Sequence, residues 1–88
     1  MDAPKEITDE YYQTLHNAGI PVAHRGSTML GFRDGFYAAS RKQREMMLHD
    51  IDNYKNELVE GNIPIFRHQF RVKGFKAGWE AYVKLTEA

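Results

Sequence analysis

Five consecutive residues combine the groups that most often bind an anion at the start of a helix. His24 and Arg25 are followed by Gly26 and by the hydroxyl side chains of Ser27 and Thr28. If a helix begins at Ser27 or Thr28, its free N–H groups and the positive end of its dipole would face an anion. Arg25 could then bind a phosphate through two parallel hydrogen bonds. The same pattern is also that of a plain helix cap beside a solvated arginine, so both interpretations stay open.

Aromatic and basic residues elsewhere could complete such a site. Tyr11 and Tyr12 are adjacent, so on a helix their side chains diverge by about 100° and only one can pack inward. The other could stack on a nucleotide base, while Arg67 or Arg71 of a neighbouring subunit binds its phosphate. This pattern predicts a site for a small anionic ligand, with core or boundary packing of both tyrosines as the alternative interpretation.

A basic edge formed by Arg67, His68, Arg71 and Lys76 would also suit nucleic acid. However, the 12 basic and 12 acidic residues of the chain leave no net charge, whereas proteins that bind nucleic acid usually carry a positive one. Nucleic-acid binding therefore ranks third among the functions considered.

The residue types that metal sites and enzymes need are scattered or missing. The chain has no cysteine, and its four histidines lie apart in the sequence. It contains no nucleophile elbow, no His-Glu-x-x-His pair and no Walker-type loop. We therefore expect no metal site, no cofactor and no enzymatic activity.

Length and composition indicate one ordinary globular domain covering residues 1–88. Apolar residues make up 42% and charged residues 27% of the chain, which is unlike the composition of disordered proteins. No apolar run approaches the roughly 20 residues of a membrane span, and the first residues are polar rather than typical of a signal peptide. We expect a cytoplasmic protein that makes no membrane contact.

Hydrophobic spacing and helix-terminating residues predict an all-α fold of three helices. A short helix at about 8–18 ends before Gly19, whose flexible backbone suits the left-handed position after a helix. A long central helix at about 27–59 contains no proline. It ends at Gly61, and a C-terminal helix covers about 64–86. We expect the central and C-terminal helices to form an antiparallel hairpin.

The two longer helices share a motif, Gly-Phe-basic-x-Gly-aromatic-x-Ala, at residues 31–38 and 74–81. Each glycine inside a helix costs about 1 kcal/mol relative to alanine, so the motif indicates close helix contacts. In an antiparallel hairpin Gly74 would face residue 48, and the two motifs would not meet within one chain. They would pack in the core, for example on the first helix, or form a contact between subunits, or Gly31 or Gly35 would kink the long helix. The residues predicted for such an interface are Gly31, Phe32, Gly35, Phe36, Gly74, Phe75, Gly78, Trp79 and Tyr82.

The C-terminal helix is apolar on two adjoining faces, which is more than one neighbouring helix can cover. This width predicts a homo-oligomer. Its segment Gly-Phe-Lys-Ala-Gly-Trp-Glu-Ala-Tyr, residues 74–82, resembles segments of small accessory proteins of bacteriophages. The resemblance implies a phage or prophage origin, where such proteins often bind a host protein or counter a defence system.

Three functions follow in order of preference. The first is a non-enzymatic helical interaction protein that associates with itself and occupies a partner protein, such as a phage-encoded inhibitor of a host or defence protein. The second is an oligomer that binds a small anionic ligand at Arg25, Ser27 and Thr28. The third is a nucleic-acid-binding protein.

Overall fold

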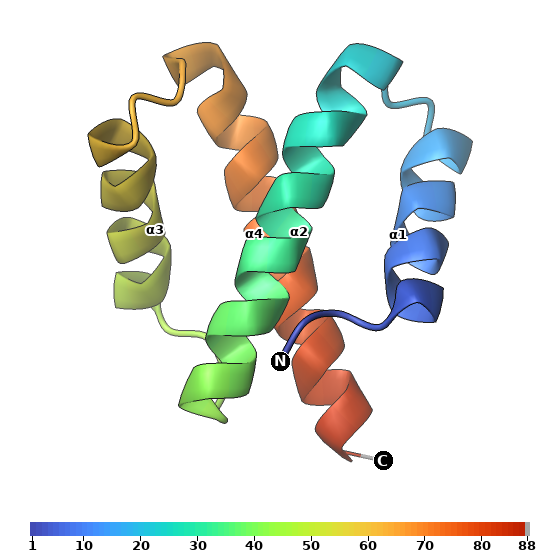
Figure 1. Ribbon diagram of the computed structural model, residues 1–88, viewed down its shortest axis with the longest axis vertical. Helices are drawn as coiled ribbons and strands as arrows, with labels where there is room; N and C mark the ends of the chain where they lie inside the picture. The colour runs from blue at the N-terminus through green and yellow to red at the C-terminus, as the bar shows by residue number, and fades with distance from the viewer. Residues whose placement is uncertain (88) are drawn as a thin grey trace.

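The computed structural model describes residues 1–87, which form four α-helices (Figure 1). The all-α class predicted above is confirmed, whereas the prediction of three helices is wrong. The helices are α1 (Lys5–Asn17), α2 (Val22–Lys42), α3 (Leu48–Glu60) and α4 (Ile65–Glu87).

The central helix expected at about 27–59 is two helices separated by the loop 43–47. Gln43 ends α2 in a left-handed conformation, with φ at 54°. One tertiary contact and one local cap hold this loop: the indole N–H of Trp79 donates to the carbonyl of Arg44 at 2.8 Å, and Asp50 caps α3 by accepting the N–H of Met47 at 2.8 Å. The break therefore arises from packing and capping rather than from a helix-breaking residue.

The C-terminal ends of α1, α3 and α4 lie close to their predicted positions, whereas α1 and α2 begin three and five residues before theirs. Gly19 follows α1 with φ at 75°, which confirms the left-handed terminator. After α3 the left-handed residue is Asn62, with φ at 58°, rather than Gly61. Helix α2 begins at Val22, five residues before the predicted Ser27, because Pro21 supplies a pre-set N-cap whose carbonyl accepts the first turn's N–H groups.

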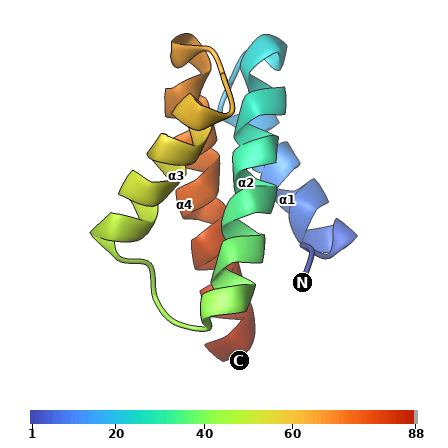
Figure 2. The ribbon, with the colours of Figure 1, turned by 60° about the vertical axis from the view of Figure 1, so that its left-hand side comes forward.

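Helices α2 and α4 lie at the centre and run in the same direction, with α1 beside α2 and α3 beside α4 (Figures 1 and 2). Each outer helix is antiparallel to the central helix that follows it. The prediction of an antiparallel hairpin therefore holds for α3 and α4 alone. The most extensive contact of α4 is with α2, to which it is parallel.

The two glycine motifs meet inside one chain, so the register argument that kept them apart is wrong. A Cβ atom on Gly31 would overlap the carbonyl oxygen of Arg71, and one on Gly35 would overlap that of Phe75. Glycines of α4 approach α2 in the same way, since a Cβ on Gly74 would overlap the carbonyl of Thr28. The close packing predicted for these motifs is thus intramolecular. The nine residues predicted for an interface lie on α2 and α4, and all are buried except Tyr82, which is half-buried.

The chain consists of two copies of one helical hairpin, α1–α2 and α3–α4. Each residue of the first copy corresponds to the residue 43 positions later. The identical or similar pairs run well beyond the glycine motifs: Tyr11 and Tyr54, Leu15 and Leu58, Ile20 and Ile63, Pro21 and Pro64, Gly31 and Gly74, Phe32 and Phe75, Gly35 and Gly78, Phe36 and Trp79.

The contacts repeat with the residues. The ring of Tyr11 stacks on Phe32 with centroids 4.4 Å apart. Its counterpart Tyr54 stacks on Phe75 at 4.2 Å. The turn after α1 is closed by a bond of 3.1 Å from the N–H of Ile20 to the carbonyl of Leu15, and the turn after α3 has the equivalent bond at 3.0 Å. The two hairpins are therefore the same structural unit, related by an approximate twofold axis.

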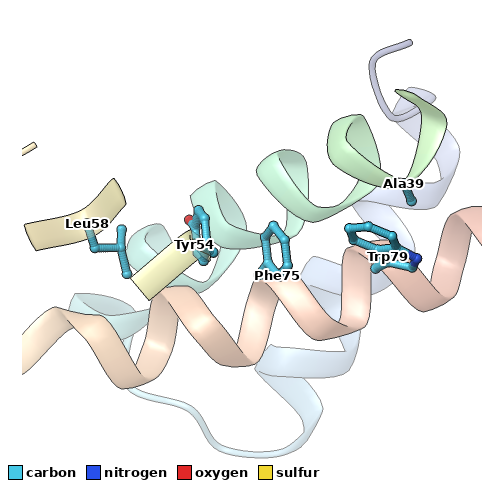
Figure 3. Close-up of a cluster of buried hydrophobic side chains, with 5 residues drawn as sticks. All are labelled: Ala39, Tyr54, Leu58, Phe75 and Trp79. Carbon is cyan, nitrogen blue, oxygen red and sulfur yellow. The ribbon is translucent and has the colours of Figure 1, made fainter. Parts of the chain in front are cut away.

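Aromatic side chains from α3 and α4 fill the core of the second hairpin (Figure 3). Tyr54 and Leu58 of α3 pack on Phe75 and Trp79 of α4, and Ala39 of α2 closes the cluster. All five are at most 4% exposed. Burial of one large apolar side chain stabilises a fold by about 1.5–3 kcal/mol, so this cluster fixes α3 on the central pair.

Candidate functional site

The predicted anion-binding residues do not begin α2: Arg25 ends its first turn, and Ser27 and Thr28 lie in the second. Arg25 donates from Nε to the carbonyl of Ile20 at 2.7 Å, and its guanidinium lies 5.8 Å from the ring centre of Tyr12. Thr28 is 1% exposed and donates its hydroxyl to the carbonyl of His24. Ser27 is half-buried beside it. The free N–H groups that the prediction required are absent at these positions, because intrahelical bonds already use them.

The remaining predicted ligand residues are not gathered around Arg25. Tyr11 packs inward against α2, where burial raises the pKa of its hydroxyl, while Tyr12 is exposed. Arg71 reaches the carboxylate of Asp34 at 3.3 Å across the central pair. Arg67 is exposed and lies over the ring of Phe66. Within one chain these side chains have separate structural contacts and are not brought together; a site shared with a second subunit stays a prediction.

A groove between α3 and α4 combines apolar and basic lining residues. It encloses about 690 Å³. Exposed or half-buried apolar side chains of Val59, Val72 and Ala77 line it. We call it the α3–α4 groove, and its other lining residues are Lys55, Asn56, His68, Gln69, Lys73, Lys76 and Glu80.

The rim of the α3–α4 groove is basic. Lys55, Lys73 and Lys76 are exposed, and none of them takes part in an ion pair within residues 1–87. Glu80, the one acidic lining residue among those described, lies 3.5 Å from the ammonium group of Lys84. The three lysines are therefore available to an acidic partner.

Exposed apolar side chains extend from the groove toward the turn before α4. Val59 is 64% exposed, Ile65 84% and Phe66 65%. Phe66, Gln69, Lys73 and Lys76 follow one another at spacings of three or four, so they share one stripe of α4.

The corresponding face of the first hairpin provides a comparison within the same molecule. Lys55, Lys73 and Lys76 correspond to Tyr12, Leu30 and Arg33. There the ring of Tyr12 and the guanidinium of Arg25 lie against each other. Lys55 and Lys73 thus have no basic counterpart in the first hairpin, so they are not needed to build the hairpin itself, whereas the position of Lys76 is basic in both.

A second hollow of about 550 Å³ lies between α2 and α3, but its most buried charges already serve the fold. Asp50, 6% exposed, accepts two hydrogen bonds from Arg44 at 2.8 and 2.9 Å. The bonds from Arg44 lower the pKa of the Asp50 carboxyl to about 2. Asp34 accepts the hydroxyl of Tyr54 at 2.7 Å, and burial, reinforced by this bond, raises the pKa of that hydroxyl.

The described residues offer neither a cluster of metal ligands nor a membrane-spanning helix. Within residues 1–87 no three histidine, aspartate or glutamate side chains lie close enough to hold a metal ion. In the same part of the chain, no helix combines the length and the apolar character needed to cross a membrane.

The α3–α4 groove was only partly visible in the sequence. The basic character of α4 is plain from Lys73 and Lys76, but Lys55 and Val59 fall within the single central helix predicted for about 27–59. Comparison of residues 43 positions apart would have separated α3 from α2. No protein-family model, curated protein or solved structure matches the chain, so its function must be inferred from the site.

Proposed function

We propose that this protein is a non-enzymatic binding protein that holds an acidic, amphipathic helix of a partner protein in the α3–α4 groove. The observation that supports this most directly is the combination of apolar lining residues with three lysines that form no ion pair within residues 1–87. An amphipathic helix lays its apolar face into such a groove. Acidic residues at the edges of that helix would meet Lys55, Lys73 and Lys76.

The apolar lining of the groove favours a protein helix over nucleic acid. Lys55 lies on α3 and Lys73 and Lys76 lie on α4, and Val59, Val72 and Ala77 line the same groove. A nucleic acid would contact the lysines through phosphates and would leave these apolar side chains without a partner. An acidic helix satisfies both features.

A defined probe tests the proposal. The probe is a fluorescein-labelled helical peptide with leucines at i, i+4, i+7 and i+11 and glutamates flanking them. Fluorescence anisotropy should report saturable binding that weakens as salt rises. A peptide of the same composition with its leucines spread around the helix should bind at least about tenfold more weakly, a difference of ~1.4 kcal/mol.

Charge reversal locates the binding surface. Lys55→Glu, Lys73→Glu and Lys76→Glu together should weaken binding by about tenfold or more, because three attractive contacts of up to ~1 kcal/mol each become repulsive. The matched control combines Lys5→Glu and Arg33→Glu with Val22→Glu and Ala23→Glu, which changes the net charge equally at exposed positions outside the groove. Equal loss in both variants, or preferential binding of a 20-nucleotide RNA, would reject the proposal.

A further inference from the structure

The loop 43–47 contains residues that favour a helix. Gln, Arg, Glu and Met all rank among the strong helix formers, and neither glycine nor proline occurs from residue 43 to 47. Gln43 nevertheless adopts φ of 54°, a conformation that side-chain-bearing residues disfavour. The local sequence thus opposes the local structure, which is a conflict that tertiary contacts must resolve.

Arg44 is the residue that resolves it. Its guanidinium donates two hydrogen bonds to Asp50 and lies 5.6 Å from the ring centre of Trp79, while its carbonyl accepts the indole N–H. Met46 packs against the core of the second hairpin. These contacts fold the chain back so that α3 runs antiparallel to α2.

The duplicated architecture makes exchange between two copies geometrically simple. Contact between the halves is dominated by α2 and α4, and the loop 43–47 is their one covalent link. If this loop becomes helical, α2 and α3 merge into one straight helix, and the α3–α4 hairpin is carried away from its own α2. The vacated face of α2 then fits α4 of a second copy, since the helix–helix contacts between the halves are available from that copy. The contacts of Arg44 with Trp79 are the ones that the exchange gives up.

We infer that this chain forms a domain-swapped dimer, in which each copy has a continuous helix through 43–47 and each α3–α4 hairpin packs on the α1–α2 hairpin of the other copy. The two continuous helices run antiparallel about a true twofold axis. This follows because α3 must remain antiparallel to the α2 on which its hairpin docks. Both α3–α4 grooves are preserved, because each lies within one exchanged hairpin.

Substitutions in the loop 43–47 shift the balance in stated directions. Arg44→Ala removes the contacts of Arg44 with Asp50 and Trp79 and should lower the dissociation constant of the dimer by about tenfold or more. Gln43→Ala raises the helix propensity of the loop in both copies and should lower the dissociation constant by roughly threefold. Gln43→Gly favours the turn and gives monomer. Adding Glu45→Pro to Arg44→Ala prevents a continuous helix and restores the monomer.

The measurement is light scattering after size-exclusion chromatography, with each full-length variant refolded from denaturant over a range of concentrations. Gln43 is exposed, so its substitution does not disturb the packed interior. Gln43→Ala therefore still tests the dimer if Arg44→Ala does not fold. Monomers for both alanine variants at every concentration would overturn the proposal. Dimers of Arg44→Ala/Glu45→Pro as stable as those of Arg44→Ala would also overturn it.

A distance measurement distinguishes the swapped dimer from simple association. The chain has no cysteine, so Tyr37→Cys and Asn53→Cys in the Gln43→Ala variant allow specific spin labelling. Both positions line the hollow between α2 and α3, whereas on one continuous helix they would be about 24 Å apart. In dimers diluted with unlabelled chain, the long distance should replace the short one. A dimer that keeps the short distance would refute the exchange, and neither result bears on peptide binding in the groove.

Discussion

Substitution of Gly35 by alanine tests the central feature of the fold, the close crossing of α2 and α4. A Cβ atom at this position would lie 2.8 Å from the Cα of Phe75 and would overlap its carbonyl oxygen. Carbon atoms pack best at about 3.5–4.0 Å, so the two helices must separate by about 1 Å. The obstacle is backbone, which cannot rotate away as a side chain could.

The expected net effect of Gly35→Ala is a loss of about 2 kcal/mol in the free energy of unfolding. Overpacking costs up to ~3 kcal/mol, and this site is at the upper end because separation of the helices also loosens Phe36 and Trp79, which are at most 1% exposed. Alanine returns about 1 kcal/mol through its better helix propensity. For a chain of this size the melting temperature should fall by about 8–16 °C.

Gly26→Ala is the matched control, because a Cβ atom at Gly26 meets nothing within 4 Å. This position is also inside α2, so alanine should stabilise the protein by about 0.5–1 kcal/mol. The assay is urea and thermal unfolding followed by circular dichroism, with unfolding slopes compared between variants. If Gly35→Ala stabilises the chain as Gly26→Ala does, α2 and α4 do not cross at these glycines.

Two further predictions concern polar contacts. The pKa of Asp50 is lowered from 3.8 to about 2 in the folded state. Its ionised form therefore adds about 2 kcal/mol to the free energy of unfolding above pH ~4, and this contribution is lost as the pH falls toward 2. Urea titrations from pH 6 to 2 should show this loss in the wild type and a much flatter profile in Asp50→Asn; parallel profiles would contradict the assignment. Tyr54→Phe removes a hydrogen bond to Asp34 and should destabilise the fold by ~1–2 kcal/mol, as measured by thermal unfolding. Tyr11→Phe, the matched control, should change the free energy of unfolding by less than about 0.5 kcal/mol, because the Tyr11 hydroxyl makes no hydrogen bond within residues 1–87. Equal effects of the two substitutions would show that the bond from Tyr54 to Asp34 does not stabilise the fold.

The sequence was informative where local residues decide the structure. Gly19 and the Gly-Asn-x-Pro turn that begins at Gly61 each mark a helix end through backbone preferences that act over a few residues. The helical class and the tight packing of the glycine motifs follow from composition and spacing in the same way. These features depend little on which helices become neighbours.

The loop 43–47 could not be predicted because its cause lies elsewhere in the chain. Its residues favour a helix, and the contacts that interrupt it come from Asp50 and from Trp79, 35 residues after Arg44. Without that break, α3 becomes a continuation of α2. The C-terminal helix is then expected to pack along one central helix, which pairs Gly74 with residue 48 rather than with α2. The α3–α4 groove was obscured for the same reason, since Lys55 and Lys73 are brought together only by the correct hairpin.

The parallel course of α2 and α4 also has an electrostatic consequence. Two aligned helices place their negative dipole ends together, an arrangement that adjacent antiparallel helices avoid. At that shared end α2 carries Arg41 and Lys42 in its last turn, and α4 carries Lys84. These cations offset the combined negative poles, so part of the basic charge of the chain stabilises its unusual helix alignment. Neutralising all three should therefore disturb the central pair more than the outer helices, even though each side chain lies at the surface.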